Sequence, residues 1–336
     1  MKPYYSFDDQ MKECFGGKVY RLALSAAVTC PNRDGTCGTG GCIFCSAGGS
    51  GDFAESSELG IAAQIELAKK RVAGKLSKSF AGYMAYFQSY TETYGDQDYL
   101  ASCFKEAAAK PEILALSIAT RPDSISDEML LVLKAINAEK PVYIELGLQT
   151  IHEDTARYIN RGYSLSVFED AVKRIRNAGL GVVVHVIIGL PGEDEEKTRD
   201  TVKYLAELNI GGAHIDGIKL QLLHVLKGTR LAKLLPEIIQ EEPCGRAAET
   251  ALAEKGHGLR IHERIILNDG NFLTCYNMER YAEFVAELVG LLPGDIAVHR
   301  LTGDAPKKLL LCPKWTADKK RVLNTITKAF GSRGQN

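Results

Sequence analysis

The chain has 336 residues, of which 45% are hydrophobic and 25% are charged, and this composition excludes the disordered and collagen-like classes. That length is enough for two average domains, or for one large α/β barrel with an appendage. Because 41 Lys and Arg residues balance 42 Asp and Glu residues, the net charge of −1 gives no overall attraction to nucleic acid or to a membrane surface. An anionic partner would have to bind a local basic patch.

Six strands are predicted along the chain, at Val19–Ala27, Phe80–Gln88, Ile113–Ala119, Pro141–Leu148, Val182–Gly189 and Ala213–Leu220. Helical periodicity lies between them, at Glu58–Val72, Asp98–Ala109, Asp127–Ala138, Val167–Ala178 and Asp194–Leu208. Strands joined by helical crossovers predict a parallel sheet, either open and doubly wound or curved into a partial barrel. In both arrangements ligands bind at the carboxyl ends of the strands.

The loop after the first predicted strand carries the strongest chemical signal. Cys42 and Cys45 form a C-x2-C pair, Cys30 lies upstream, Cys37 falls between, and several glycines let the backbone wrap closely around a bulky ligand. A structural zinc site would use four thiolates, but the spacing C-x6-C-x4-C-x2-C matches it poorly. A dithiol redox pair leaves Cys30 and the glycines unexplained. An iron–sulfur cluster on three cysteines would leave one iron free for a ligand, and the position of the loop favours this interpretation.

The fourth predicted strand has polar residues on one face. A period of two places Glu145, Gly147 and Gln149 together, opposite an apolar face. A carboxylate in such a strand is costly unless it binds something. Glu145 therefore either contacts a ligand or pairs with a neighbouring Lys or Arg.

The start of the chain, MKPYYSFDDQMKECFGG, has neither the basic nor the apolar region of a signal peptide, and no run of 18 apolar residues follows. We therefore expect a cytoplasmic location. The nine cysteines, an odd number, favour metal, cluster or redox chemistry over a disulfide framework.

Over nearly its whole length the sequence resembles the radical SAM superfamily. The resemblance is carried by the motifs TCPNRDGT, GGCIFC, YFQSYTETY, ATRPD, ELGLQT, HVIIGLPGE, KLQLLHVLKGT and VHRLTGDAP. They are similar to those of the YtqA/YhcC-like subgroup, related to the Elp3/MiaB branch, whose cluster pattern is a Cys, eleven residues and then C-x2-C. Most of the superfamily has C-x3-C-x2-C and a GGE motif, and this chain departs from both.

The resemblance implies an α/β fold, a partial (β/α)6 TIM-like barrel of the radical SAM type at residues 1–235. A C-terminal α/β extension follows at 236–336, with a possible helical insertion at 236–270 and a basic tail. The implied cofactors are a [4Fe–4S] cluster and S-adenosyl-L-methionine (SAM). Cys30, Cys42 and Cys45 match the cluster ligands, which leaves Cys37 as an extra thiol.

The residues implied to bind SAM are Phe44, Gln88, Ser89, Thr91, Glu145, Gln149, Ile187 and Gly189. Phe44 matches an aromatic residue near the adenine, and the segment from Gln88 to Thr91 matches the site of the methionine end. Glu145 and Gln149 are candidates for the ribose. The backbone at Ile187 and Gly189 is a candidate for adenine contacts.

In the implied chemistry, the reduced cluster donates an electron to SAM and the resulting 5′-deoxyadenosyl radical removes a hydrogen atom from the substrate. Relatives similar to YtqA convert the carboxymethylaminomethyl side chain of the tRNA wobble uridine toward the aminomethyl form. The implied partners are tRNA, a one-electron donor such as flavodoxin or ferredoxin, and a downstream tRNA methyltransferase, with no membrane partner. Two alternatives stay open: a radical SAM enzyme that acts on a small molecule, and a non-catalytic, zinc-stabilised RNA-binding protein.

Further candidates for RNA or substrate contacts lie late in the chain. From Ala305 to Asn336, eight Lys or Arg residues face a single acidic residue, a pattern that fits either phosphate binding or a solvated helix face. Tyr276 and Trp315 could stack on exposed bases or lie in the core. His224 and His299 are candidates for substrate contacts. His185 is expected in the core or near the site.

Overall fold

The structure, a computed structural model, describes residues 3–49, 51–236 and 263–333. The predicted helical insertion at 236–270 therefore lies mostly outside the described residues. Its last part is not helical, because β8 (Glu263–Ile266) pairs antiparallel with β9 (Phe272–Cys275). Among the helices that the structure describes, none is both long and apolar enough to cross a membrane.

Seven parallel strands form a curled half-barrel in the order β1-β2-β3-β4-β5-β6-β10. They are β1 (Lys18–Leu24), β2 (Phe80–Phe87), β3 (Ile113–Thr120), β4 (Val142–Gln149), β5 (Gly181–Ile188), β6 (Gly217–Leu222) and β10 (Ala297–Arg300). The partial barrel is confirmed, and the first six strands overlap their predicted ranges. Their apolar runs are long enough to be recognised by periodicity alone.

The seventh strand was not predicted. β10 has only four residues, Ala-Val-His-Arg, which is too short and too polar to stand out as a strand. It pairs in parallel with β6, although a short strand, the β8–β9 hairpin and two helices of the described residues lie between them in the sequence. The C-terminal extension thus supplies one strand to the central sheet.

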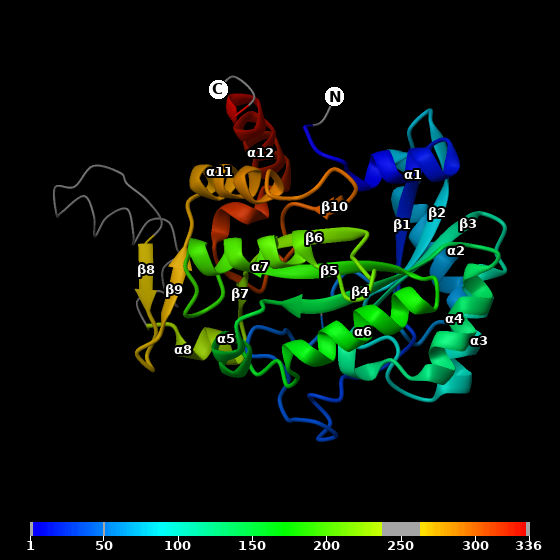
Figure 1. The fold of residues 1–336 in the computed structure, drawn as a ribbon, viewed down its shortest axis with the longest axis horizontal. Helices are drawn as coiled ribbons and strands as arrows, with labels where there is room; N and C mark the ends of the chain where they lie inside the picture. The colour runs from blue at the N-terminus through cyan, green and yellow to red at the C-terminus, as the bar shows by residue number, and fades with distance from the viewer. Residues whose placement is uncertain (1–2, 50, 237–262, 334–336) are drawn as a thin grey trace.

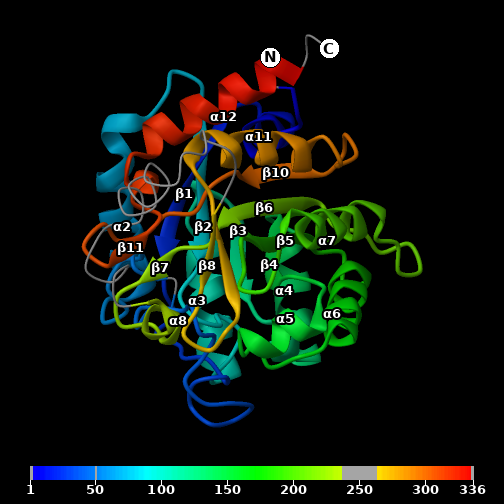
Figure 2. The same cartoon turned by 90° about the vertical axis from the view of Figure 1, so that its left-hand side faces the viewer.

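Helices cover the outer face of the sheet, as the helical periodicity predicted (Figure 2). They are α2 (Ile61–Val72), α3 (Gln97–Ala108), α4 (Asp127–Asn137), α5 (Glu153–Tyr158), α6 (Leu165–Asn177) and α7 (Glu195–Glu207). Three of them begin at a side-chain cap, because Asp96, Ser126 and Asp194 each accept a backbone N–H from the first turn of α3, α4 or α7. Their apolar faces pack on outward residues of the strands in one continuous core.

The curled sheet encloses an interior space, the lumen of the half-barrel. A helix that precedes the sheet fills this lumen near the amino ends of the strands. α1 (Phe7–Phe15) begins at Ser6, which forms a capping box with Asp9. Met11 of this helix packs with inward residues near the start of five strands, namely Val19, Met84, Ala115, Tyr143 and Val183. The space left inside the half-barrel therefore lies toward the carboxyl ends of the strands.

The remaining C-terminal elements surround one side of the half-barrel (Figure 1). They are β7 (Val225–Leu226), α8 (Arg230–Leu234), α11 (Met278–Val289), β11 (Leu310–Cys312) and α12 (Lys319–Arg333). β7 pairs with β11, and α11 packs against α12, beside which both termini lie. The predicted α/β character of the extension is present in these elements.

Candidate functional site

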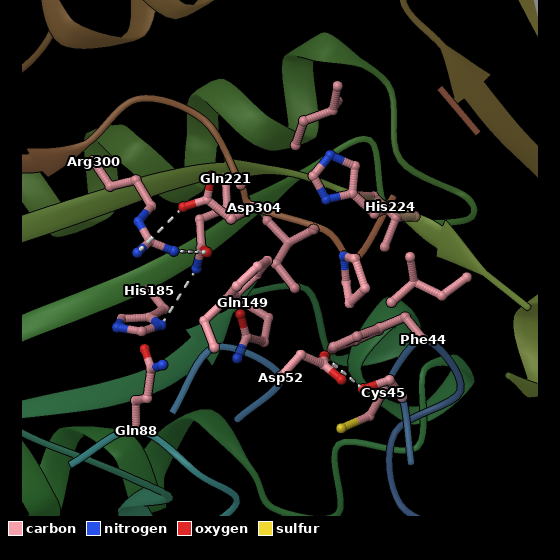
Figure 3. Close-up of a pocket in the computed structure, with 18 of the residues that line it drawn as sticks. Phe44, Cys45, Asp52, Gln88, Gln149, His185, Gln221, His224, Arg300 and Asp304 are labelled. Carbon is pink, nitrogen blue, oxygen red and sulfur yellow. Dashed lines mark hydrogen bonds and ion pairs between the residues drawn. The ribbon is translucent and has the colours of Figure 1, made fainter. Parts of the chain in front are cut away.

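A pocket of about 470 Å³ occupies the lumen near the carboxyl ends of the strands (Figure 3). Its strand walls include the inward residues Arg21, Tyr86, Gln88, Gln149, His185 and Gln221. Three segments complete it: the loop after β1 carries Phe44 and Cys45, the segment after β6 carries His224, and the loop after β10 carries Asp304. Inward side chains at the strand ends thus meet in one cavity, as expected for this class of fold.

Cys30, Cys42 and Cys45 lie in the loop between β1 and α2, and Cys45 lines the pocket. The N–H of Cys45 donates to the carbonyl oxygen of Cys42 at 3.1 Å, which closes a turn between these two residues. Burial and, to a smaller extent, the neighbouring thiols of Cys45 and Cys30 raise the pKa of the Cys42 thiol to about 12. The three sulfur atoms are therefore close enough to affect one another electrostatically.

Glycines allow the backbone of this loop to turn sharply around the cysteines. Gly40 and Gly41 have φ angles of 74° and 71°, a left-handed conformation that favours glycine. A Cβ at Gly41 would lie 2.9 Å from Nε of Arg33, whose guanidinium donates to the carbonyl oxygens of Cys45 and Ser46. The backbone around the cysteines is thus held in place by an arginine for which only glycine leaves room.

Cys37 lies in the same loop but differs from the other three cysteines. Its side chain is exposed, and its Sγ accepts from the Arg121 guanidinium at 3.7 Å. Arg121 is held by Asp123, with which it forms an ion pair at 2.6 Å. Cys37 thus contacts Arg121 of the same chain, and its role as an extra thiol stays a prediction.

The donor set has the chemistry of an iron–sulfur cluster site. Cys30, Cys42 and Cys45 are free, partly buried thiols in a glycine-rich loop, and a cluster takes each thiolate on a separate iron. Within residues 3–49, 51–236 and 263–333, no three His, Cys, Asp or Glu side chains are arranged around a single metal ion.

Four of the eight predicted SAM-binding residues line the pocket: Phe44, Gln88, Gln149 and Ile187. Gln149 has a φ of 70°, and its buried Oε1 has no hydrogen-bond partner among the described residues. An unsatisfied buried amide is costly unless a ligand completes it. Gln149 is therefore placed as a ligand-binding side chain would be.

The other four predicted SAM-binding residues, Ser89, Thr91, Glu145 and Gly189, do not form the wall of this pocket. Gly189 lines a smaller pocket that shares Leu222 and Leu223 with the main one. Ser89 and Thr91 are buried in the segment that follows β2. Their predicted contacts with SAM stay predictions.

Glu92 holds that segment in place. Its carboxylate accepts two backbone N–H groups, from Ala26 at 3.0 Å and from Ser89 at 2.9 Å. Burial raises the pKa of Glu92 to about 8, although both backbone hydrogen bonds oppose the rise. Near neutral pH the carboxyl group is therefore largely protonated.

Glu92 is expected to make the free energy of unfolding fall as the pH rises from about 5 to 8. The carboxyl proton of Glu92 is bound more tightly in the native state than in the unfolded state. The resulting contribution to the free energy of unfolding is complete below the unfolded pKa of 4.5. It is lost as the pH rises through the native pKa of about 8. The slope approaches about 1.4 kcal/mol per pH unit. Glu92→Gln should flatten the dependence and cost about 1 kcal/mol at pH 5, because only its amide oxygen can accept a backbone N–H. Urea unfolding of the anaerobic, metal-free protein measures both, and an unchanged slope would assign the dependence to other groups.

Glu145 is buried in the lumen and is held by three side chains. Ser117 Oγ–H donates to Oε1 at 2.6 Å, His185 Nε2–H donates to Oε2 at 2.8 Å, and the Lys219 ammonium pairs with Oε2. Although burial raises the pKa of Glu145, Lys219 and His185 hold it well below its usual range. The paired carboxylate weighed in the sequence analysis is thus present, and the ribose contact of Glu145 stays a prediction.

His185 links this buried pair to the pocket. Gln221 Nε2 donates to His185 Nδ1 at 3.3 Å, so Nδ1 is the acceptor and Nε2 carries the proton that bonds Glu145. Burial and, to a smaller extent, the charge of Lys219 lower the pKa of His185 to about 4, although Glu145 opposes the shift. The imidazole is therefore neutral and fixed in one tautomer.

Two histidines and two aromatic residues were also candidates for RNA or substrate contacts, and the structure places them differently. His224 lines the pocket. His299 does not: its ring is bonded to Arg21 at 2.8 Å and to Gln10 at 3.1 Å. Tyr276 and Trp315 are part of the core, because Tyr276 is buried and the Trp315 Nε1–H donates to its carbonyl oxygen at 2.9 Å. The core alternative is therefore correct for both aromatic residues.

Several residues of the pocket were missed in the sequence, namely Arg21, Asp52, Gln221, Arg300 and Asp304. A signal was available for Arg21, because it alternates with Leu22 and Leu24 in the first strand, as Glu145 does in the fourth. Arg300 and Asp304 belong to the unpredicted strand β10 and its loop, so their place in the lumen depended on tertiary structure.

Comparisons with known proteins agree with this architecture. Residues 32–205 match the radical SAM superfamily, and residues 266–331 match the radical SAM C-terminal domain. The chain is 35% identical to YtqA of Bacillus subtilis over 99% of this chain and 91% of that protein. It is 31% identical to YhcC of Escherichia coli over 92% of this chain and 86% of that protein.

More distant relatives match a smaller part of this chain or of their own length. A tRNA uridine(34) acetyltransferase of Methanocaldococcus jannaschii is 28% identical over 40% of this chain and 25% of that protein. The solved structure of Elp3 from Methanocaldococcus infernus superposes with a TM-score of 0.56 at 15% identity, covering 90% of this chain. The chain spans only 63% of that structure, which shows a shared fold.

Proposed function

The chain belongs to the radical SAM superfamily, and on that premise we propose that it acts in the conversion of the carboxymethylaminomethyl side chain of the tRNA wobble uridine to the aminomethyl form. Enzymes of this family use a [4Fe–4S] cluster and SAM, which supply a 5′-deoxyadenosyl radical that takes a hydrogen atom from the substrate. The observation that carries the proposal is the three-cysteine loop at the edge of a polar lumen pocket. Similarity to an enzyme named for tRNA uridine 34 supports the choice of substrate.

In this proposal Cys30, Cys42 and Cys45 hold the cluster and the pocket wall orients SAM. The amides of Gln88 and Gln149 line the pocket and can accept or donate hydrogen bonds to polar groups of the cofactor. Phe44 and Ile187 supply apolar contact and exclude water from the reacting atoms. The cofactor performs the difficult bond cleavage, so the protein's task is placement and shielding.

The remaining predicted SAM residues do not line this pocket and would contribute from positions next to it. Ser89 and Thr91 belong to the segment that Glu92 fixes. Glu145 would act through His185, whose tautomer it sets. Gly189, with a φ of 82°, would offer its backbone at the neighbouring small pocket.

A basic groove lies between α11 and α12 and would track tRNA phosphates. Lys320, Arg321 and Lys328 line it, together with Glu279 and Asp318. Lys319, next in the basic run, is not available to RNA in the same way, because its Nζ pairs with Asp304 at 2.6 Å. The candidate phosphate contacts are therefore the three basic residues of the groove.

Charge reversal of the groove is expected to weaken tRNA binding and its salt dependence. Phosphate contacts release counterions, so affinity for tRNA should fall steeply between low and moderate salt. The triple variant Lys320→Glu, Arg321→Glu, Lys328→Glu should flatten the slope of log affinity against log salt by about one unit for each phosphate that is no longer neutralised. Filter binding across a salt series measures the slope.

A matched control reverses three exposed lysines on the outer helices, Lys134, Lys173 and Lys203, and should leave the slope unchanged. Equal slopes for wild type and the groove variant would make the groove a solvated surface only. A wild type that binds no tRNA at any salt would favour the alternative substrate, a small molecule.

The proposal includes further partners. A one-electron donor such as flavodoxin or ferredoxin would reduce the cluster, a tRNA methyltransferase would act on the aminomethyl product, and the location would be cytoplasmic. Iron and sulfide content after anaerobic preparation, compared with zinc content, tests the cluster. Zinc without iron would favour the non-catalytic RNA-binding alternative.

A further inference from the structure

Arg21 is a cation in the lumen with few partners. It lies at an inward position of β1 and lines the pocket. Its Nη2 bonds His299 Nδ1 at 2.8 Å, and its Cζ lies 3.8 Å from the centroid of the Phe7 ring. Its buried Nε has no hydrogen-bond partner, and no carboxylate lies within 4.0 Å of the guanidinium among the described residues. A guanidinium has five N–H donors, so most of the donor capacity of Arg21 is unused.

His299 does not balance this charge. Its Nδ1 accepts from Arg21 and its Nε2–H donates to Gln10 Oε1 at 3.1 Å, which fixes a neutral ring. Burial lowers the pKa of His299 well below its usual range, and Arg21 lowers it further. His299 therefore orients Arg21 without supplying a negative charge, and the Glu145 carboxylate stabilises the guanidinium only at longer range, with no direct ion pair between them.

The charges around this end of the pocket are unequal. Arg21, Lys219, Arg300 and Lys319 are cations, whereas the acids that contact any of them are Glu145 and Asp304. Glu145 forms an ion pair with Lys219. Asp304 forms ion pairs with both Lys319, at 2.6 Å, and Arg300, at 3.8 Å. Among the described residues, Arg21 is thus left without a carboxylate in direct contact, and Arg300 shares its own with Lys319.

The polar and charged side chains of the pocket are unevenly distributed over its wall (Figure 3). Arg300, Gln221 and His185 gather on one side, whereas Phe44, Cys45 and Asp52 lie on the other. Both sides carry an acid, because Asp52, bonded to Ser46 at 3.0 Å, lies on the cysteine side and Asp304 pairs with Arg300. An anionic group would be attracted away from the cysteine loop and toward the guanidinium groups.

We propose that Arg21, with Arg300 beside it, forms a subsite for a carboxylate of the substrate. A guanidinium fork matches a carboxylate in charge and in bidentate geometry. Two like charges near each other in a partly dry cavity are costly, and a bound carboxylate would relieve that cost. The subsite rests on the proposed function, in which the substrate side chain ends in a carboxylate. Anchoring that end here would direct the rest of the side chain toward Cys45.

The test uses the anaerobically reconstituted holoenzyme and two anticodon stem-loop RNAs. One carries carboxymethylaminomethyluridine, and the other carries the same side chain with the carboxylate replaced by a neutral carboxamide. Wild type should bind the carboxylate RNA more tightly. Arg21→Gln should weaken binding of that RNA by about ten- to a hundredfold and leave the carboxamide RNA nearly unaffected. Arg21→Lys, which keeps the charge and loses the fork, should give an intermediate loss.

A matched control is Arg174→Gln, which removes an arginine that pairs with Asp127 on the outer surface. It should bind both RNAs as wild type does. Equal losses for both RNAs in Arg21→Gln would assign Arg21 a structural role and overturn the subsite. Weaker binding of SAM, with unchanged preference between the RNAs, would assign the guanidinium to the cofactor and would also overturn it.

A second probe separates the subsite from the tRNA proposal. N-methylglycine has the end group of the proposed side chain, and N-methylglycinamide is its neutral counterpart. Saturation-transfer NMR should detect N-methylglycine on wild type and lose it on Arg21→Gln. If that holds while neither RNA binds, the subsite stands and the tRNA substrate falls. If the RNA is modified but the carboxylate and the carboxamide bind equally, the subsite falls and the substrate stands.

Discussion

Replacing Cys30, Cys42 or Cys45 with alanine is expected to abolish both iron binding and reductive cleavage of SAM. Each change removes one thiolate from a set of three, and a [4Fe–4S] cluster with only two protein ligands is not retained. Because the three thiols lie in one glycine-rich loop at the pocket, we expect the same loss from each change. Iron and sulfide analysis, the absorbance near 400 nm and 5′-deoxyadenosine formation measure it.

Cys37→Ala is the matched control, since it removes a thiol from the same loop. Cys37 is exposed and bonded to Arg121, so its loss should leave iron content and SAM cleavage near wild type. Loss of the cluster in Cys37→Ala together with its retention in Cys30→Ala would reverse the ligand assignment.

Lys219→Met is expected to lower the free energy of unfolding by about 3–5 kcal/mol. The change leaves the Glu145 carboxylate buried without its cation, and removing one partner of a buried pair costs that much. The double variant Glu145→Gln, Lys219→Met removes both charges of the pair, so neither is left without the other, and it should recover part of the loss. Denaturant unfolding of the anaerobic, metal-free protein measures all three free energies.

The control for that experiment is a surface ion pair of similar chemistry. Lys197 pairs with Asp154 at 2.6 Å on the outer face, and both side chains are solvent-accessible. Lys197→Met should therefore cost less than about 1 kcal/mol. If Lys219→Met cost no more than this control, the buried pair would not be an ion pair in solution.

Local patterns in the sequence were sufficient for most of the fold. The six long strands follow from apolar runs with a period of two, and the curved sheet follows from their helical crossovers. α1 was missed because FDDQMKECF is mostly polar, although the capping residues Ser6 and Asp9 marked its start. β10 carried no local signal, because its four residues are stabilised by pairing with β6.

The site divides in the same way. Spacing alone indicated the cysteine loop, and strand periodicity indicated the inward face of Glu145 and Gln149. The partner of Glu145 could not be predicted, because Lys219 lies 74 residues away and reaches it only through the curvature of the sheet. The contact of Arg21 with His299 spans 278 residues and joins β1 to β10 across the lumen. Contacts of this kind depend on the closed shape of the half-barrel.

The late position of β10 also bears on how the chain is made. β6 ends at Leu222, and the strand that covers its edge begins at Ala297. At translation rates of about 5–20 residues per second, the roughly 80 residues up to the end of β10 take about 4–16 s to synthesise. During that interval the nascent sheet exposes a row of unpaired N–H and C=O groups along β6, a template for pairing with another chain. A message truncated before Ala297 would make that exposure permanent, so release of an incomplete chain would yield an aggregation-prone product.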